Sequence, residues 1–97
     1  MKREAVVRTL SRNRAEIEHR FGVASLTLFG SVARDEAGLE SDIDLLVSFR
    51  RPPGFDGYMA LKWYLEALLE RNVDLVMEGA LRPETWSIVE ADAFRVA

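Results

Sequence analysis

Cysteine is absent from this 97-residue sequence, and histidine occurs only once. Without cysteine there is no disulfide framework, no thiolate metal site and no cysteine nucleophile. The single histidine, His19, lies in a basic segment with no evident orienting partner, so neither a Ser-His-Asp triad nor a histidine-based zinc site is supported. Because a reducing compartment suits such a chain, we expect a cytoplasmic protein.

Long apolar runs are also absent, since no stretch approaches the roughly 18 residues that a membrane-spanning helix requires. The first residues, MKREAVVRTL, are basic but lack the unbroken apolar core of a secretory signal, so no membrane association is expected. The composition is ordinary for a globular protein, with 48% apolar and 30% charged residues. At this length we expect one domain over residues 1–97.

A strong positive charge is missing too, because the formal net charge is −3. Residues 1–21 carry six basic and three acidic side chains, whereas the remainder carries seven basic and thirteen acidic side chains. Nucleic-acid-binding domains usually present a pronounced basic surface. We therefore expect no direct contact with nucleic acid.

Apolar spacing predicts helices that alternate with short strands along the chain. This order predicts an α/β (α+β) fold, in which a small mixed β-sheet of about three to four strands is flanked by helices. Gly22 is the expected stop of the first helix. Helices are expected over residues 2–20, 31–36, 58–71 and 83–93, and strands over residues 26–29, 42–49 and 73–77.

Three aspartates are expected on one face of this sheet. Asp42 and Asp44 lie two residues apart in a strand, so their side chains share a face. In the next strand Asp74 emerges on the same face if the apolar sides of both strands pack on one core. Such carboxylates repel one another, and a divalent cation that prefers oxygen ligands, Mg²⁺ or Mn²⁺, would relieve the repulsion. Taken alone, the Asp-Ile-Asp triplet also fits the solvated face of an edge strand.

A glycine–serine pair precedes these aspartates at an expected strand end. Gly30 would let the backbone approach a ligand closely, and Ser31, at the N-cap of the short helix, would add a hydroxyl to an anion site. Arg34, one helical turn later, could reach the same anion. Each residue alone also fits an ordinary turn, cap or surface arginine. Together with the carboxylates they indicate phosphoryl or nucleotidyl transfer, without a loop of the P-loop type.

Gly30-Ser31, followed after ten residues by Asp42-x-Asp44, resembles the signature of the polymerase-beta-like nucleotidyltransferases. The resemblance covers roughly residues 5–95 and is to the short, single-domain branch, the minimal nucleotidyltransferases. It implies the polymerase-beta-like nucleotidyltransferase fold for this chain.

The resemblance implies that Gly30, Ser31 and Arg34 hold the phosphates of a nucleoside triphosphate such as ATP. The chain departs from the usual pattern at Asp35, where many members of the family carry glycine. A carboxylate there adds negative charge near the expected phosphate path, so we expect slightly weaker triphosphate binding.

By the same resemblance, Asp42, Asp44 and Asp74 are the ligands of two Mg²⁺ ions, for which Mn²⁺ can substitute. Asp74 would also help to activate an acceptor hydroxyl. The implied reaction is in-line attack of that hydroxyl on the α-phosphate of the nucleotide, with pyrophosphate leaving.

Members of the short branch are often encoded beside a HEPN-domain protein and act as its antitoxin, and some transfer AMP from ATP to a tyrosine of the toxin. The resemblance therefore implies an adenylyltransferase that is the antitoxin of a toxin–antitoxin pair and forms a hetero-oligomer with a HEPN-domain toxin. The alternative is a non-catalytic antitoxin that neutralises its partner by binding alone.

The helix expected from residue 58 is apolar on nearly all sides. If Tyr58, Trp63 or Tyr64 were exposed, they would form an apolar patch of the kind found at protein interfaces. A central, well-buried helix explains the same composition without any partner.

Overall fold

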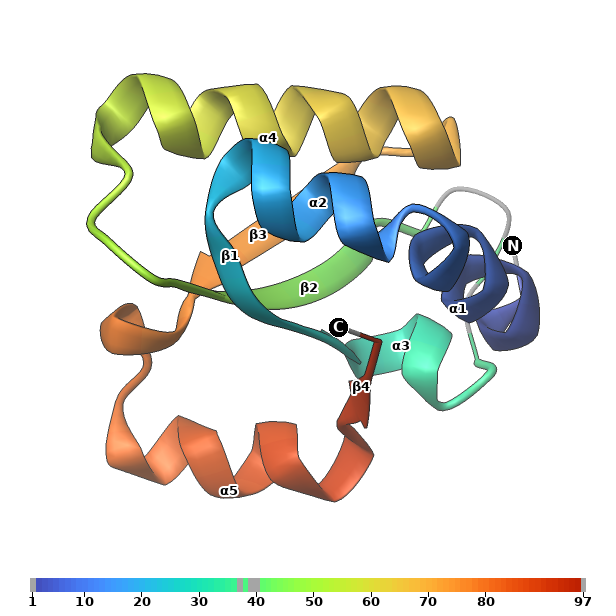
Figure 1. The fold of residues 1–97 in the computed structure, drawn as a ribbon. Helices are drawn as coiled ribbons and strands as arrows, with labels where there is room; N and C mark the ends of the chain where they lie inside the picture. Colours follow the sequence, from blue (N-terminus) through green and yellow to red (C-terminus); the bar gives the residue numbers. More distant parts are fainter. Residues whose placement is uncertain (1, 37, 39–40, 97) are drawn as a thin grey trace.

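The computed structural model describes residues 2–36, 38 and 41–96, and it consists of a mixed β-sheet covered by helices (Figure 1). The helices are α1 (Arg3–Arg12), α2 (Arg14–Phe21), α3 (Gly30–Ala33), α4 (Gly54–Leu69) and α5 (Pro83–Asp92), with a 3₁₀ turn η1 (Glu78–Ala80). The strands are β1 (Val23–Phe29), β2 (Ile43–Phe49), β3 (Val73–Met77) and β4 (Phe94–Arg95).

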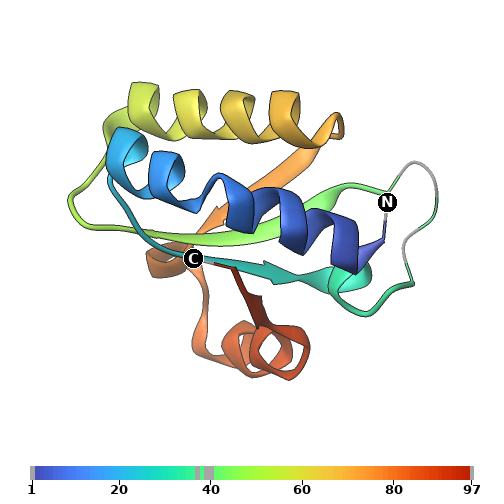
Figure 2. The ribbon, with the colours of Figure 1, turned by 45° about the vertical axis from the view of Figure 1, so that its right-hand side comes forward.

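The sheet has the strand order β3-β2-β1-β4. β1 pairs antiparallel with both β2 and β4, whereas β2 and β3 are parallel and are connected through α4. Helices α1, α2 and α4 cover one face of the sheet, and α5 lies on the other (Figure 2). The expected mixed sheet flanked by helices is therefore confirmed.

Alternation along the strands explains why the core forms on the face that α1, α2 and α4 cover. In β2 the side chains of Ile43, Leu45 and Val47 are almost completely buried, and Leu46 is buried on the opposite face, where α5 lies. Every fourth residue of α4 faces this core. The largest fully buried side chains of the helices and of β1 are those of Val6, Leu10, Ile17, Val23, Leu26, Leu28, Val32, Leu61 and Leu65.

The helix expected over residues 2–20 is two helices, α1 and α2, which meet at Asn13. The side-chain amide of Asn13 donates to the Thr9 carbonyl at 2.9 Å, and its backbone N–H donates to the Leu10 carbonyl. Asparagine side chains compete in this way with regular helical hydrogen bonds, so the helix breaks where apolar periodicity continues. The stop at Gly22 is confirmed, since its φ of 66° is in the left-handed region typical of a helix end.

The other boundaries differ modestly from expectation. β1 begins at Val23 and α4 at Gly54, three and four residues earlier than predicted. β4 was not expected, because two residues carry no alternation; it is defined by pairing of Phe94 with Leu28 across the sheet. None of the helices in the described part of the chain has the length and apolarity that crossing a membrane requires.

The aromatic residues of α4 divide between the core and the surface. Trp63 is 62% exposed, as an interface patch requires. Tyr58 and Tyr64 are partly buried against the core instead. The Tyr58 hydroxyl donates to the Leu75 carbonyl at 2.5 Å. The centres of the Tyr64 and Phe21 rings are 5.0 Å apart. Of the three aromatic residues considered for an exposed patch, only Trp63 is exposed, while the two tyrosines join α4 to β3 and α2.

This division predicts different stability losses along α4. We expect Tyr58→Ala to lower the free energy of unfolding by about 2–4 kcal/mol, because it removes a packed ring and a hydrogen bond. Trp63→Ala should change it by less than about 0.5 kcal/mol, as for other surface substitutions. Urea unfolding of both variants measures the difference. Equal losses in the two variants would contradict the assigned positions.

Candidate active site

Pairing between β2 and β3 places two of the expected aspartates next to each other. The strands are parallel and in register, with Asp44 opposite Asp74. Residues opposite each other on neighbouring strands point to the same face and are about 4.8 Å apart across the sheet. Asp42 comes directly before β2 and is exposed, as is Asp74, whereas Asp44 is partly buried. This face is the one on which α5 lies.

Gly30 brings the backbone of the β1–α3 corner directly against the Asp44 carboxylate. β1 and β2 pair Phe29 with Asp44, so Gly30 follows immediately beside that side chain. A Cβ placed on Gly30 would lie only 2.1 Å from Asp44 Oδ2, and the φ of Gly30 is 76°. Only glycine combines this backbone conformation with such a close approach. Gly30 was expected to let the backbone approach a ligand closely, which remains a prediction; the group that it approaches in this structure is the Asp44 carboxylate.

Ser31 does not occupy the cap position that was predicted for it. Helix α3 begins one residue earlier, so Phe29 is the N-cap and Ser31 lies inside the helix, partly buried. The turn starts at Gly30, directly after β1, because the Gly30 carbonyl already accepts a hydrogen bond from the Arg34 N–H although its own φ is left-handed. Ser31 therefore remains within the corner, next to the glycine that contacts Asp44.

The electrostatic surroundings of Asp44 reflect the grouping of charges. Burial, followed by the neighbouring carboxylates of Asp74 and then Asp42, raises the pKa of Asp44 above its usual value. The guanidinium of Arg34 lowers it in part. Asp44 thus lies within electrostatic range of both other aspartates and of the arginine that the motif predicted. Its ionised form is disfavoured in this site.

The donor set of this site fits a divalent metal ion. All three side chains offer carboxylate oxygens, which are the ligands that Mg²⁺ prefers, and a cation would relieve the repulsion around Asp44. Within residues 2–36, 38 and 41–96, however, no three acidic, histidine or cysteine side chains are already arranged closely enough to hold a metal. Asp44 and Asp74 are neighbours on one face and Asp42 directly precedes β2, so binding of a cation would have to draw the three side chains together.

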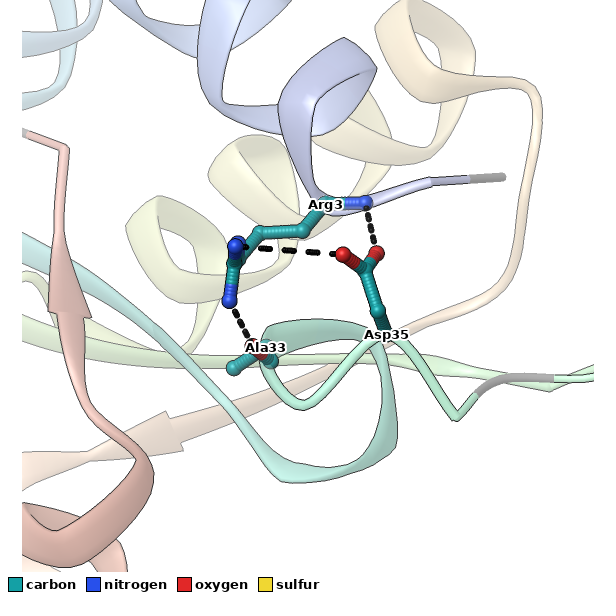
Figure 3. Close-up of polar contacts among 3 residues, drawn as sticks. All are labelled: Arg3, Ala33 and Asp35. Carbon is teal, nitrogen blue, oxygen red and sulfur yellow. Dashed lines mark hydrogen bonds and ion pairs between the residues drawn. The ribbon is translucent and has the colours of Figure 1, made fainter.

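Arg34 and Asp35, which follow the corner, are both engaged with other side chains. The Arg34 Nε atom lies 3.0 Å from Glu36 Oε2, so an incoming phosphate would compete with Glu36 for this exposed guanidinium. Asp35 was expected to add negative charge near the phosphates. Its carboxylate is instead turned towards α1, where Oδ1 accepts a hydrogen bond from the Arg3 backbone N–H at 2.9 Å (Figure 3). The expected weakening of triphosphate binding by Asp35 remains a prediction.

A family model described as a nucleotidyltransferase domain matches residues 10–96 of the chain. The chain belongs to this nucleotidyltransferase family. The match includes the Gly30 corner, both strands that carry the aspartates and α5. A protein adenylyltransferase, MntA, from Thermococcus cleftensis is 42% identical over 79 residues, which are 81% of this chain and 80% of the relative.

Solved structures have the same fold as this chain. A structure described as a minimal nucleotidyltransferase aligns with a TM-score of 0.81 and 36% identity, over 97% of this chain and 95% of its own. A chain from a complex of tri-AMPylated HEPN toxin with MNT antitoxin, from Shewanella oneidensis, aligns with a TM-score of 0.67 at 17% identity. That alignment covers 94% of this chain and 71% of the other. The expected minimal nucleotidyltransferase fold is therefore confirmed.

Proposed function

We propose that this protein is a metal-dependent adenylyltransferase that transfers AMP from ATP to a tyrosine of a HEPN-domain toxin, and that it is the antitoxin of that pair. The observation that carries the proposal is the pairing of Asp44 with Asp74 on β2 and β3, directly beside the Gly30 corner. Support for AMP as the transferred group comes from the adenylyltransferase relative of Thermococcus cleftensis. Support for the partner comes from the complex of an AMPylated HEPN toxin with MNT antitoxin, which has the same fold.

In this proposal each substrate approaches Asp44 from a different side, which the strand order supports. Because β2 lies between β1 and β3, Gly30 and Asp74 are on opposite sides of Asp44. The triphosphate would bind on the β1 side, against the backbone of Gly30 and Ser31. The acceptor hydroxyl would then enter on the β3 side, near Asp74. The α-phosphate would then lie between the two, close to Asp44.

Each charged residue then has a distinct task. Asp42, Asp44 and Asp74 would hold two Mg²⁺ ions, or Mn²⁺, which supply charge neutralisation at the phosphates and lower the pKa of the acceptor hydroxyl. Arg34 would exchange its contact with Glu36 for the triphosphate. The tyrosine oxygen forms a bond to the α-phosphorus, the bond to the β-phosphate oxygen breaks, and pyrophosphate leaves. The phenolic proton passes by way of the Asp74 carboxylate to water.

The test combines purified protein, Mg²⁺ and ATP labelled at the α-phosphate with the HEPN-domain protein encoded beside its gene. We expect label on a tyrosine of the partner, and no label when the Asp42→Ala/Asp44→Ala double variant replaces the wild type. ATP labelled at the γ-phosphate should leave the partner unlabelled, since pyrophosphate departs. A tight complex of the partner with both proteins, but no label with either, would overturn catalysis in favour of an antitoxin that acts by binding alone.

A further inference from the structure

Arg3, the first residue of α1, makes three contacts with the turn that ends α3 (Figure 3). Its backbone N–H donates to Asp35 Oδ1 at 2.9 Å, and its Nη1 donates to the Ala33 carbonyl at 3.0 Å. Its Nη2 also lies 3.8 Å from Asp35 Oδ2. We call these contacts among Arg3, Ala33 and Asp35 the Arg3–Asp35 clamp. It joins residues thirty or more positions apart in the sequence.

The clamp satisfies polar groups that both helices leave without intrahelical partners. The first N–H groups of a helix and its last carbonyls have no partner within it. Here the Asp35 carboxylate accepts from the first N–H of α1, and the Arg3 guanidinium donates to the last carbonyl of α3. A carboxylate at a helix start and a cation at a helix end are also favoured by the helix dipoles. Asp35 reaches this position with a φ of 58°, in the left-handed region.

Arg3 also contacts the edge strand of the sheet. The Arg3 guanidinium carbon lies 5.7 Å from the centre of the Phe94 ring in β4, a distance at which a cation and an aromatic face attract each other. Arg3 thus bridges α1, the end of α3 and β4. A lysine could contact one of these groups but could not span them with a planar fork of donors.

Helix α3 has only four residues, and its first two are Gly30 and Ser31. A helix of a single turn does not hold its own position, because forming one turn is unfavourable without outside contacts. The carbonyl that Arg3 binds is at the opposite end of that turn, on Ala33. A contact that holds Ala33 therefore also helps to hold the first residue of the turn, Gly30, which lies against Asp44.

We propose that Arg3 and Asp35 are positioning residues for the nucleotide site, which act by holding the Gly30–Ser31 corner against Asp44. This inference rests on the proposed function, because it assumes that the corner binds the triphosphate. Neither residue needs to touch ATP. Loss of the clamp should weaken binding of the phosphates, which the corner contacts before and during the reaction, more than it slows the chemical step.

The expected result for Arg3→Ala is a rise of about tenfold in the KM for ATP, with kcat within about threefold of the wild type. The KM of Arg3→Lys should lie between those of the wild type and Arg3→Ala. Asp35→Asn should stay close to the wild type, because the amide oxygen still accepts from the Arg3 N–H and asparagine tolerates a positive φ. Asp35→Ala, which has no acceptor, should resemble Arg3→Ala. The matched control is Arg12→Ala, an exposed arginine at the other end of α1.

Binding of a non-hydrolysable ATP analogue, followed by calorimetry, separates this inference from the proposed function. Equal analogue affinity in wild type and Arg3→Ala would overturn the clamp, even if the variant unfolds at a lower temperature. A wild type that binds the analogue but transfers no AMP would overturn the proposed function and leave the clamp testable by affinity alone. A wild type that binds no analogue would overturn both. If Arg3→Ala does not fold, the analogue affinities of Arg3→Lys and Asp35→Asn are compared instead. The affinity of Arg3→Lys should be the weaker of the two, and equal affinities would overturn the clamp.

Discussion

Replacing Gly30 with alanine is expected to lower the rate of AMP transfer by about a hundredfold or more. The substitution displaces the Asp44 carboxylate or the backbone beside it, and both must keep their relative positions for the reaction. The added Cβ would lie 2.1 Å from Asp44 Oδ2 and 3.0 Å from Asp44 Cγ. Either the carboxylate or the corner has to move, and either movement separates the phosphate-binding backbone from Asp44. Initial rates with labelled ATP and the HEPN-domain partner measure this loss.

Two other glycines serve as controls that distinguish the effect of this steric clash from the effect of a strained backbone. Gly22 and Gly54 also have positive φ, of 66° and 69°, but an added Cβ would meet nothing within 4 Å at either position. Gly22→Ala and Gly54→Ala should each lose about 1–2 kcal/mol of stability, the cost of a left-handed alanine, and keep the transfer rate. If Gly30→Ala is folded and transfers AMP at the wild-type rate, the contact between the corner and Asp44 has no part in catalysis.

Asp44→Asn is expected to make the metal-free protein more stable while it abolishes transfer. Burial and two nearby carboxylates raise the pKa of Asp44, so its ionised form destabilises the fold at neutral pH. This cost disappears as the pH falls through the raised pKa, because the folded state then holds the proton more tightly than the unfolded state. A neutral amide of the same shape removes the cost at every pH. Since solvent screens the site, we expect a rise in Tm of roughly 2–5 °C in EDTA.

Mg²⁺ should reverse the order of stability. A cation bound by the aspartates stabilises the folded wild type by mass action, whereas Asp44→Asn has lost a charged ligand and should respond weakly. Thermal unfolding in EDTA and in millimolar Mg²⁺ measures both effects. Glu90→Gln, which neutralises an exposed carboxylate on α5, serves as the control and should respond to Mg²⁺ like the wild type. An equal Mg²⁺ response in Asp44→Asn would show that Asp44 is not a metal ligand.

The face that carries the aspartates could be predicted because strand alternation is a local property. Apolar residues at every second position of β2 and β3 require a buried face, and the side chains between them must point to the opposite face. Asp44 and Asp74 follow from that rule once both strands share one core. Alternation could not supply the register, however. A shift of β3 by two residues would keep every side chain on its face and separate the two carboxylates.

Local signals also failed where a side chain competed with the backbone or where an element was very short. The amide of Asn13 ends α1 although the apolar spacing continues, and β4 is defined only by the pairing of Phe94 and Arg95 with β1. Neither event has a periodic signature. Both depend on particular hydrogen bonds that form once the surrounding elements have packed.

By itself the sequence determined the mixed sheet, the glycine–serine corner, the shared face of the aspartates and the nucleotidyltransferase family. These follow from residue spacings along one or two neighbouring elements. Only the tertiary structure decided that Asp44 lies against Gly30, that Asp35 turns towards α1, and that Arg3 reaches the end of α3. The physical reason is that such contacts join distant residues, whose positions are set by how the apolar faces of helices and strands pack together.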